Sequence, residues 1–186
     1  NALGNYNKAL EYYFKALQIR EKVLGVEHPS TATSYNNIGV VYDRLGDYDR
    51  ALEYCFKALE IQEKVLGAEH PDTATSYNNI GCIYDDLGDY DKALGYYFKD
   101  LEISEKVLGL EHPDIATSYN NIGNVYKNLG DYNKALEYHF KALEIREKVL
   151  GIEHFKTAMS YNNIADTYEA LGEAEKAAEY LAKVMW

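Results

Sequence analysis

The sequence predicts an all-α solenoid, in which pairs of antiparallel helices stack along the chain. The main observation is a strict period of 42 residues in a chain of 186, and residues 26–67 and 68–109 differ at only ten positions. A unit of this size cannot bury its apolar face alone and has to stack on its neighbours. Two glycine series and one histidine series show the period: Gly4, Gly46, Gly88, Gly130 and Gly172; Gly25, Gly67, Gly109 and Gly151; His28, His70, His112 and His154.

The second observation is that two helical patterns fit each unit. Over residues 30–45, apolar or small residues recur on one face of a 3.6-residue period, at Tyr35, Ile38, Gly39, Tyr42 and Leu45. Pro29 suits the first helical position, and the polar Ser30 suits the positive end of the helix. Gly46 then ends the helix, because glycine readily adopts a left-handed cap.

A second helix is expected over about residues 48–66, with Asp47 as its N-cap and Gly67 after its last turn. Its wide apolar stripe indicates burial on two sides: Ala51, Leu52, Cys55, Phe56, Ala58, Leu59, Val65 and Leu66. Its outer face offers the pairs Glu53–Lys57 and Glu60–Lys64 at i,i+4 spacing. The recurring tyrosines are expected to pack between helices with their hydroxyls reaching water.

We therefore expect one repeat array of nine helices over residues 1–186. It consists of a half unit (1–25) and the units 26–67, 68–109, 110–151 and 152–186, of which the last ends in a cap-like helix. Small residues stand in the middle of each first helix, at Gly39, Gly81, Gly123 and Ala165. Glycine destabilises a helix interior by about 1 kcal/mol relative to alanine, so its recurrence indicates a closely approaching partner helix.

Composition excludes several classes of protein. Lys plus Arg number 19 against 30 Asp plus Glu, a net charge of -11, whereas nucleic-acid and anionic-membrane binders need a basic face. No apolar run approaches the roughly 18 residues of a membrane span. The two cysteines make no disulfide framework. Because the sequence begins at Asn1 without a leader, we expect a piece of a longer, cytoplasmic protein.

The repeated motif resembles the tetratricopeptide repeat. The resemblance rests on Tyr35-Asn36-Asn37-Ile38-Gly39, Tyr42, Leu45-Gly46-Asp47-Tyr48, Ala51 and Ala58-Leu59-Glu60-Ile61, and it covers the whole chain. The 42-residue length and the run from Ala142 to His154 are similar to the longer repeats of kinesin light chains. This resemblance implies a right-handed superhelix whose first helices line a concave groove, and an activity of binding peptides or proteins without catalysis.

The resemblance also indicates a row of candidate binding residues. In related superhelices, an asparagine just before the Ile-Gly pair bonds the backbone of an extended peptide, which implies this role for Asn37, Asn79, Asn121 and Asn163. A carboxamide both donates and accepts, as a peptide group does. The alternative is that these residues bond the neighbouring unit and set the superhelix. The preceding residues join the candidate set: Asn36, Asn78, Asn120 and Asn162.

Other candidate groove positions differ between units. This variation either makes the groove specific or reflects drift at exposed sites. They are Val40, Cys82, Asn124 and Asp166 at one position, Asp43, Asp85, Lys127 and Glu169 at another, and Arg44, Asp86, Asn128 and Ala170 at a third. Acidic residues outnumber basic ones, in contrast to the basic groove of kinesin light chains. We therefore expect the partner to be a neutral or basic peptide or protein segment.

Catalytic and metal-binding functions are not expected, and neither is a cofactor. Zinc needs about four converging ligands, whereas a 42-residue spacing places each of the four repeated histidines in a different unit, where a helix-entry role is the simpler interpretation. Cys55 is expected in the core. Cys82 is expected on the groove side, where its thiol is a candidate reactive group without a histidine beside it.

Two irregularities qualify the pattern. Asp100 replaces an alanine that is present at Ala16, Ala58 and Ala142, and a buried unpaired carboxylate is costly. The helix of residues 6–24 has no preceding helix, so its apolar side is expected to be bare, and bare solenoid ends can associate end to end.

Three functions remain open from the sequence. The chain is expected to be a scaffold that binds a peptide in its groove. The alternatives are an architectural or self-associating array without a peptide ligand, and a regulatory repeat segment of a larger signalling protein.

Overall fold

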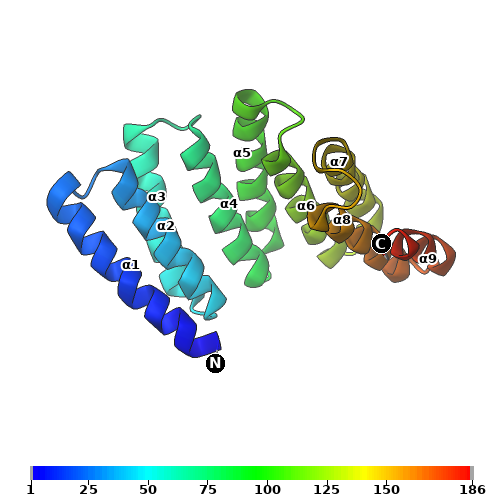
Figure 1. Ribbon diagram of the computed structural model, residues 1–186, viewed down its shortest axis with the longest axis horizontal. Coiled ribbons are helices and arrows are strands. Elements are labelled where there is room, and N and C mark those ends of the chain that lie inside the picture. Colours follow the sequence, from blue (N-terminus) through cyan, green and yellow to red (C-terminus); the bar gives the residue numbers. More distant parts are fainter. Residues whose placement is uncertain (1, 185–186) are drawn as a thin grey trace. The chain divides into compact units, whose positions relative to one another are not determined.

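The computed structural model describes residues 2–184 and is helical without strands over that range (Figure 1). Nine helices are present among these residues, as expected from the period. They are α1 (Ala2–Leu24), α2 (Pro29–Arg44), α3 (Tyr48–Val65), α4 (Pro71–Asp86), α5 (Tyr90–Leu108), α6 (Pro113–Asn128), α7 (Tyr132–Leu150), α8 (Phe155–Leu171) and α9 (Ala174–Ala182).

The chain forms two compact units, Asn1–Ile103 and Ser104–Trp186, with the division inside α5. In unit 1, α2 packs against α1, α3 and α4. In unit 2, α6 packs against α7, and α8 packs against α6, α7 and α9. Three first helices thus pair with the second helix that follows them, and Gly81 of α4 lies against Tyr97 of α5, which confirms the all-α architecture of helix pairs. The single array over 1–186 stays a prediction.

Histidine caps every first helix. The Nδ1 atom of His28 accepts a hydrogen bond from the backbone N–H of Ser30 at 3.1 Å, and His70, His112 and His154 do the same for Asp72, Asp114 and Lys156. This bond satisfies one of the N–H groups left free at a helix start. The helix-entry interpretation of these histidines therefore agrees with the structure, although proline and Ser30 were the expected start signals.

The second helices begin and end as expected. The Oδ1 atom of Asp47 accepts from the backbone N–H of Arg50 at 3.2 Å, and Asp131 caps α7 in the same way. Gly46 and Gly67 adopt φ values of 75° and 94°, which lie in the left-handed region that favours glycine. The two turns of the unit therefore depend on one aspartate and two glycines.

The mid-helix glycines lie where the two helices of a pair touch. A Cβ added to Gly81 would lie 2.7 Å from the ring of Tyr97, and one added to Gly123 would lie 2.6 Å from Nδ1 of His139. At Gly39 the obstructing atoms are Cys55 Sγ and the backbone oxygen of Ala51. These contacts confirm that close helix approach explains the glycines.

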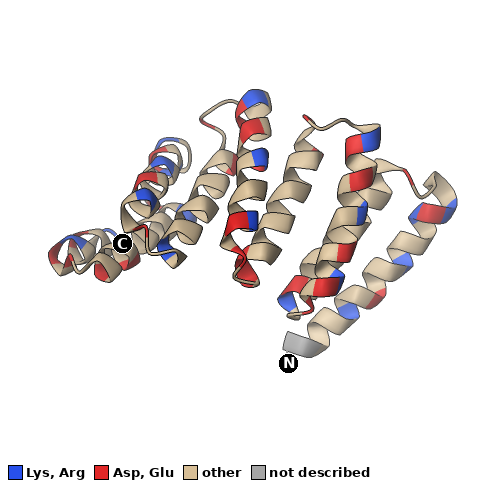
Figure 2. Cartoon of the chain, turned by 180° about the vertical axis from the view of Figure 1, so that it is seen from behind, with Lys and Arg blue, Asp and Glu red and all other residues tan. Residues whose placement is uncertain are grey.

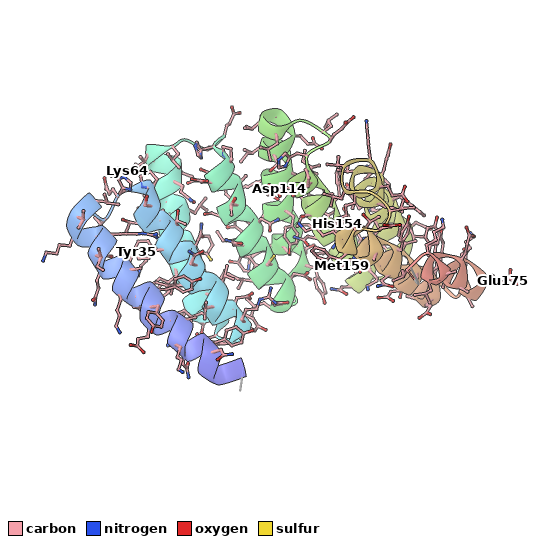
Figure 3. The ribbon with its side chains drawn as sticks, viewed as in Figure 1. Tyr35, Lys64, Asp114, His154, Met159 and Glu175 are labelled. Carbon is pink, nitrogen blue, oxygen red and sulfur yellow. The ribbon has the colours of Figure 1, made fainter. Side chains whose placement is uncertain are left out.

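Tyrosine hydroxyls bind glutamate, so the expectation that they reach water is wrong for one series. Tyr35 lies between α1 and α2 (Figure 3), and its hydroxyl donates to Glu21 Oε1 at 2.6 Å. The same bond recurs in every unit, as Tyr77–Glu63, Tyr119–Glu105 and Tyr161–Glu147. Each bond joins a first helix to the second helix before it.

Two details of the second helix differ from expectation. Lys57 pairs with Glu53 at 2.6 Å, but Lys64 binds Glu27 in the preceding loop rather than Glu60. The apolar stripe is also narrower than predicted, because Val65 is 46% exposed and Phe56 is 37% exposed. Phe56 still contacts the ring of Tyr96, with 6.2 Å between centroids, so part of its surface serves the next repeat.

Asp100 is buried, as its alanine position predicts, but it is not unpaired. Its Oδ2 atom accepts a hydrogen bond from Asn78 Nδ2 at 2.9 Å. A hydrogen bond to a charged group offsets part of the desolvation penalty of burial. The expected cost of an unpaired carboxylate therefore does not apply at this position.

We predict opposite effects of two glycine substitutions in neighbouring helices. Gly81→Ala should lower the free energy of unfolding by about 1–3 kcal/mol, because the methyl group collides with the buried ring of Tyr97. Gly95→Ala should raise it by about 0.5–1 kcal/mol, since that helical position has open space around it. Urea unfolding followed by circular dichroism measures both, and equal effects would contradict the close-contact explanation.

Candidate functional site

The first helices carry few charges except near their ends (Figure 2). Charged side chains gather instead on the second helices and the loops. The middle of each first helix is therefore largely uncharged, and it carries the Asn-Asn pair. We call the side of these helices that carries the Asn-Asn pairs the asparagine face. It is formed by α2 and α4 in unit 1 and by α6 and α8 in unit 2.

The first asparagine of three pairs joins neighbouring elements. Asn36 Nδ2 donates to Ser76 Oγ at 2.6 Å, and Asn78 donates to Asp100. In unit 2, Asn120 Oδ1 accepts from Arg146 at 3.4 Å and from Asn163 at 2.7 Å. Asn36 and Asn120 are buried. The candidates Asn36, Asn78 and Asn120 therefore have structural partners inside the protein.

The second asparagine of three pairs is placed differently. Asn37, Asn79 and Asn121 are half-buried, and their carboxamides make no hydrogen bond to any residue in the described range 2–184. Asn163 is the exception, because it donates to Asn120. Asn162 is half-buried and likewise has no side-chain hydrogen bond within that range. A partly accessible carboxamide without a partner can both donate to and accept from an incoming peptide group.

The variable positions lie on the same face. Val40, Cys82 and Asn124 are half-buried, and Asp166 is exposed. Burial raises the pKa of the Cys82 thiol to about 11. A thiol with this pKa stays protonated at neutral pH and is a poor nucleophile, so Cys82 does not match the expectation of a reactive group. Cys55 is fully buried in the core, as expected.

The asparagine face of unit 1 is acidic at the C-terminal ends of its helices. Asp43 is half-buried, and its burial, together with the nearby Asp86 carboxylate, raises its pKa to about 6, against a smaller opposing effect of Arg44. Asp85 follows on α4. In unit 2 the corresponding positions hold Lys127, half-buried, and the exposed Asp166 and Glu169. The two units therefore present different charge patterns on similar frames.

A set of polar contacts between repeats was not recognised in the sequence. Arg20 donates to Ser34 Oγ at 2.5 Å, and Arg146 donates to Ser160 Oγ at 2.7 Å. At the position of these arginines, Gln62 instead accepts from Ser76 Oγ. The period could have revealed this pairing, because the serine recurs in every unit 14 residues after the varying partner.

His139 is the most unusual titratable residue. It is fully buried, and neither ring nitrogen has a hydrogen-bond partner in the described chain. Burial, and then the nearby cations Lys127 and Arg146, lower its pKa to about 4. The ring packs against Gly123, where Cys55 and Tyr97 occupy the equivalent places. His139 is therefore a neutral packing residue at neutral pH.

Three cavities lie away from the asparagine face. One of about 420 Å³ lies in unit 1 against the Leu45–Asp49 turn, and two of about 450 and 440 Å³ in unit 2 lie against the Leu108–Pro113 loop and against Ile152, Tyr161 and Lys183. Within residues 2–184, no three His, Cys, Asp or Glu side chains come together as a metal site. No helix in the same range is both long and apolar enough to cross a bilayer.

Comparison with known families gives one consistent result. A family model described as Tetratricopeptide repeat matches residues 1–55, 44–106, 99–148 and 114–185, which together span nearly the whole chain. No curated protein matches the sequence.

Solved structures with the same fold include two at 28% identity. BtubC (BKLC) from P. vanneervenii has a TM-score of 0.84, with 98% of this chain and 73% of that chain covered. A putative kinesin light chain with nearly identical TPR-like repeats from Podosopora anserina has a TM-score of 0.78, with 98% and 87% covered. A Rap protein complexed with Competence and Sporulation Factor has 23% identity and a TM-score of 0.81, with 98% of this chain and 48% of that chain covered.

We predict that acid destabilises the protein through His139. Its folded pKa of about 4 lies below the 6.5 of an unperturbed histidine, so the unfolded state binds the proton more tightly. Stability is then complete above pH 6.5 and is lost as the pH falls toward 4, with a loss of about 2 kcal/mol by roughly pH 5. Thermal unfolding across this range measures the loss. The His139→Tyr variant, which introduces the residue found at the equivalent Tyr97, should lack this part of the pH dependence, and an unchanged dependence would contradict the assignment.

Proposed function

The chain belongs to the tetratricopeptide-repeat family, whose repeats are generally protein–protein interaction modules, and from this membership we propose that it is a non-catalytic scaffold that binds an extended peptide. The proposed binding surfaces are the asparagine faces within each unit. Asn37, Asn79 and Asn121 would hold the peptide backbone, and the variable positions would read its side chains.

The observation that carries this proposal is that the two asparagines of a pair differ in their hydrogen bonding. Asn36, Asn78 and Asn120 already form hydrogen bonds with residues of the protein. The contacts between repeats therefore do not need the second asparagine of these pairs. The following asparagines are half-buried and have no partner in the described chain. An unused carboxamide at a fixed spacing is expensive to bury in an apolar contact, but it suits a peptide group of any sequence.

The charge of the faces supports a neutral or basic peptide. In unit 1, the acidic residues Asp43, Asp85 and Asp86 outnumber the single basic residue Arg44, and the whole chain has a net charge of -11. Complementary charge steers association and rejects partners of like charge. The Rap protein complexed with Competence and Sporulation Factor supports the general idea that this fold receives a partner.

An architectural role without a peptide ligand is the second candidate. It is favoured by the near-identity of residues 26–67 and 68–109, because identical surfaces carry little specificity. End-to-end self-association belongs to this candidate. Light scattering over a range of concentrations tests it, since a self-associating array grows in mass as its concentration rises.

We predict that the two asparagines of a pair respond differently to substitution. The double variant Asn37→Ala, Asn79→Ala should keep the unfolding midpoint and weaken binding of a peptide selected from a random library by roughly tenfold or more, because two hydrogen bonds of about 1 kcal/mol each are lost. Asn36→Ala should instead lower stability by about 1–3 kcal/mol, since Ser76 loses a buried donor.

Isothermal titration and urea unfolding measure the two effects. Asn133→Ala, an exposed asparagine on α7, is the matched control and should change neither quantity. Unchanged peptide affinity in the double variant, or loss of its fold, would refute the proposed role.

We further predict a pH-dependent preference for basic peptides. Asp43 becomes charged as the pH rises through about 6, so a lysine-containing peptide should bind more tightly above this pH relative to its glutamate-containing counterpart. The preference should weaken at high salt, because ions screen exposed charges. Titrations of both peptides against the wild type and Asp43→Asn test this, and tighter binding of the acidic peptide at low salt would be the contrary outcome.

A further inference from the structure

Unit 2 contains a buried arginine that has only neutral partners. Arg146 on α7 is 4% exposed. Its Nη1 atom donates to Asn120 Oδ1 at 3.4 Å, to the backbone oxygen of Lys156 at 3.2 Å and to Ser160 Oγ at 2.7 Å. The Nε atom is buried without a hydrogen-bond partner, and Nη2 makes no hydrogen bond within residues 2–184. Burial lowers the pKa of Arg146, and no carboxylate of the described chain opposes this effect. A buried charge is costly unless it is paired, so this guanidinium group would be stabilised by an anion that reaches it.

The equivalent positions in unit 1 do not share this property. Arg20 donates to the serine of its junction as Arg146 does, but Arg20 is only half-buried, so water can still hydrate its charge. Gln62 occupies the same position between α3 and α4, where it is neutral and accepts from the serine. The buried and uncompensated charge is therefore specific to Arg146.

The buried atoms that lack a hydrogen-bond partner also differ between the two units. In the described part of unit 1 they are the oxygens Asn36 Oδ1 and Asp43 Oδ1, whereas in unit 2 they are nitrogens of His139 and Arg146. The charges that lower the pKa of His139, in addition to its burial, are the cations Lys127 and Arg146, without a contribution from a carboxylate. Unit 1 therefore leaves acceptors unsatisfied, and unit 2 leaves a cationic group unsatisfied.

Arg146 lies next to the asparagine face of unit 2, because α7 packs against both α6 and α8 (Figure 1). Asn120 directs its Oδ1 atom toward Arg146 and Asn163, so its Nδ2 atom has no hydrogen-bond partner within residues 2–184. A carboxylate that enters between α6 and α8 would meet amide and guanidinium donors together. The Nε and Nη2 atoms form one edge of the guanidinium group, and such an edge can bind both oxygens of a carboxylate through two parallel hydrogen bonds.

We propose that the asparagine face of unit 2 holds a carboxylate group of the partner peptide against Arg146. This proposal rests on the peptide-binding function proposed above, and it names an aspartate or glutamate as one residue that the peptide carries. Asp166 and Glu169 are exposed on α8, where water and salt screen their repulsion, whereas Arg146 is removed from water. A segment that offers a basic side chain to unit 1 and an acidic one to unit 2 is neutral overall, in agreement with the expected partner.

The first test uses a simple carboxylate and needs no peptide. Sodium acetate titrated into the full chain should shift the side-chain amide NMR signals of Asn120 and Asn163 saturably, beyond the effect of sodium chloride at equal ionic strength. Arg146→Gln should remove this shift and keep the fold, because Gln62 bonds the junction serine from the same position in unit 1. Lys148→Gln removes an exposed charge from the same helix and should leave the shift unchanged.

The second test asks whether the partner supplies the carboxylate. A peptide selected from a random library against the full chain should carry an acidic residue. Its replacement by the corresponding amide should weaken binding to the wild type by roughly tenfold or more, because a bidentate, charge-assisted pair is lost. The same replacement should barely change binding to the Arg146→Gln chain.

The site is refuted if acetate acts no differently from chloride, or if it shifts the signals of the Arg146→Gln chain equally. If acetate binds but no selected peptide depends on an acidic residue, the site takes free anions and the proposed source of the carboxylate is wrong. Failure to select any peptide would instead refute the peptide-binding function, and the acetate titration would then distinguish a free-anion site from none.

Discussion

The close contact between the two helices of a pair is the constraint on which the structure depends. Gly81 and Gly123 face rings rather than open space, and Gly39 faces a cysteine and the partner backbone. Glycine is unfavourable in a helix interior, so the close approach of the two helix axes is accompanied by a loss of local helix stability. The residue opposite the glycine can then vary from Cys55 to Tyr97 to His139 while the contact itself is kept. The tyrosine stacks lie across the same helix pairs.

The helices and turns could be predicted from the sequence because their signals are local and are repeated. Proline, glycine and aspartate mark the helix ends, and the same residues recur in every unit, so all nine helices were expected. The partners of the side chains were harder to predict. Lys64 has Glu60 at the favoured spacing on its own helix, yet it binds Glu27, which folding brings from the preceding loop. Tyr35 binds Glu21 for the same reason, since a contact between helices has no fixed spacing until the packing is known.

The candidate site was predicted as a row of equivalent asparagines, and the structure divides that row. Asn36 and Asn37 are neighbours in sequence, but a helix turns about 100° per residue, so Asn36 enters the contact with the next repeat, whereas Asn37 is half-buried and makes no side-chain hydrogen bond among residues 2–184. The 42-residue period alone could not separate the two roles, because both residues recur with it, and the peptide-binding role of Asn37 and its equivalents came only from the resemblance. Asn163 shows that the division is not uniform, as its carboxamide contacts Asn120 in unit 2.

The serine that joins successive repeats has a further consequence for how such a chain can evolve. Its hydroxyl accepts a hydrogen bond from Arg20 or Arg146 at some junctions and donates one to Gln62 at another. Because one hydroxyl serves in either direction, a copied or transplanted repeat meets a compatible neighbour whichever residue that neighbour presents. Gain or loss of one repeat by duplication or deletion therefore leaves this serine hydroxyl with a hydrogen-bond partner at the new joint.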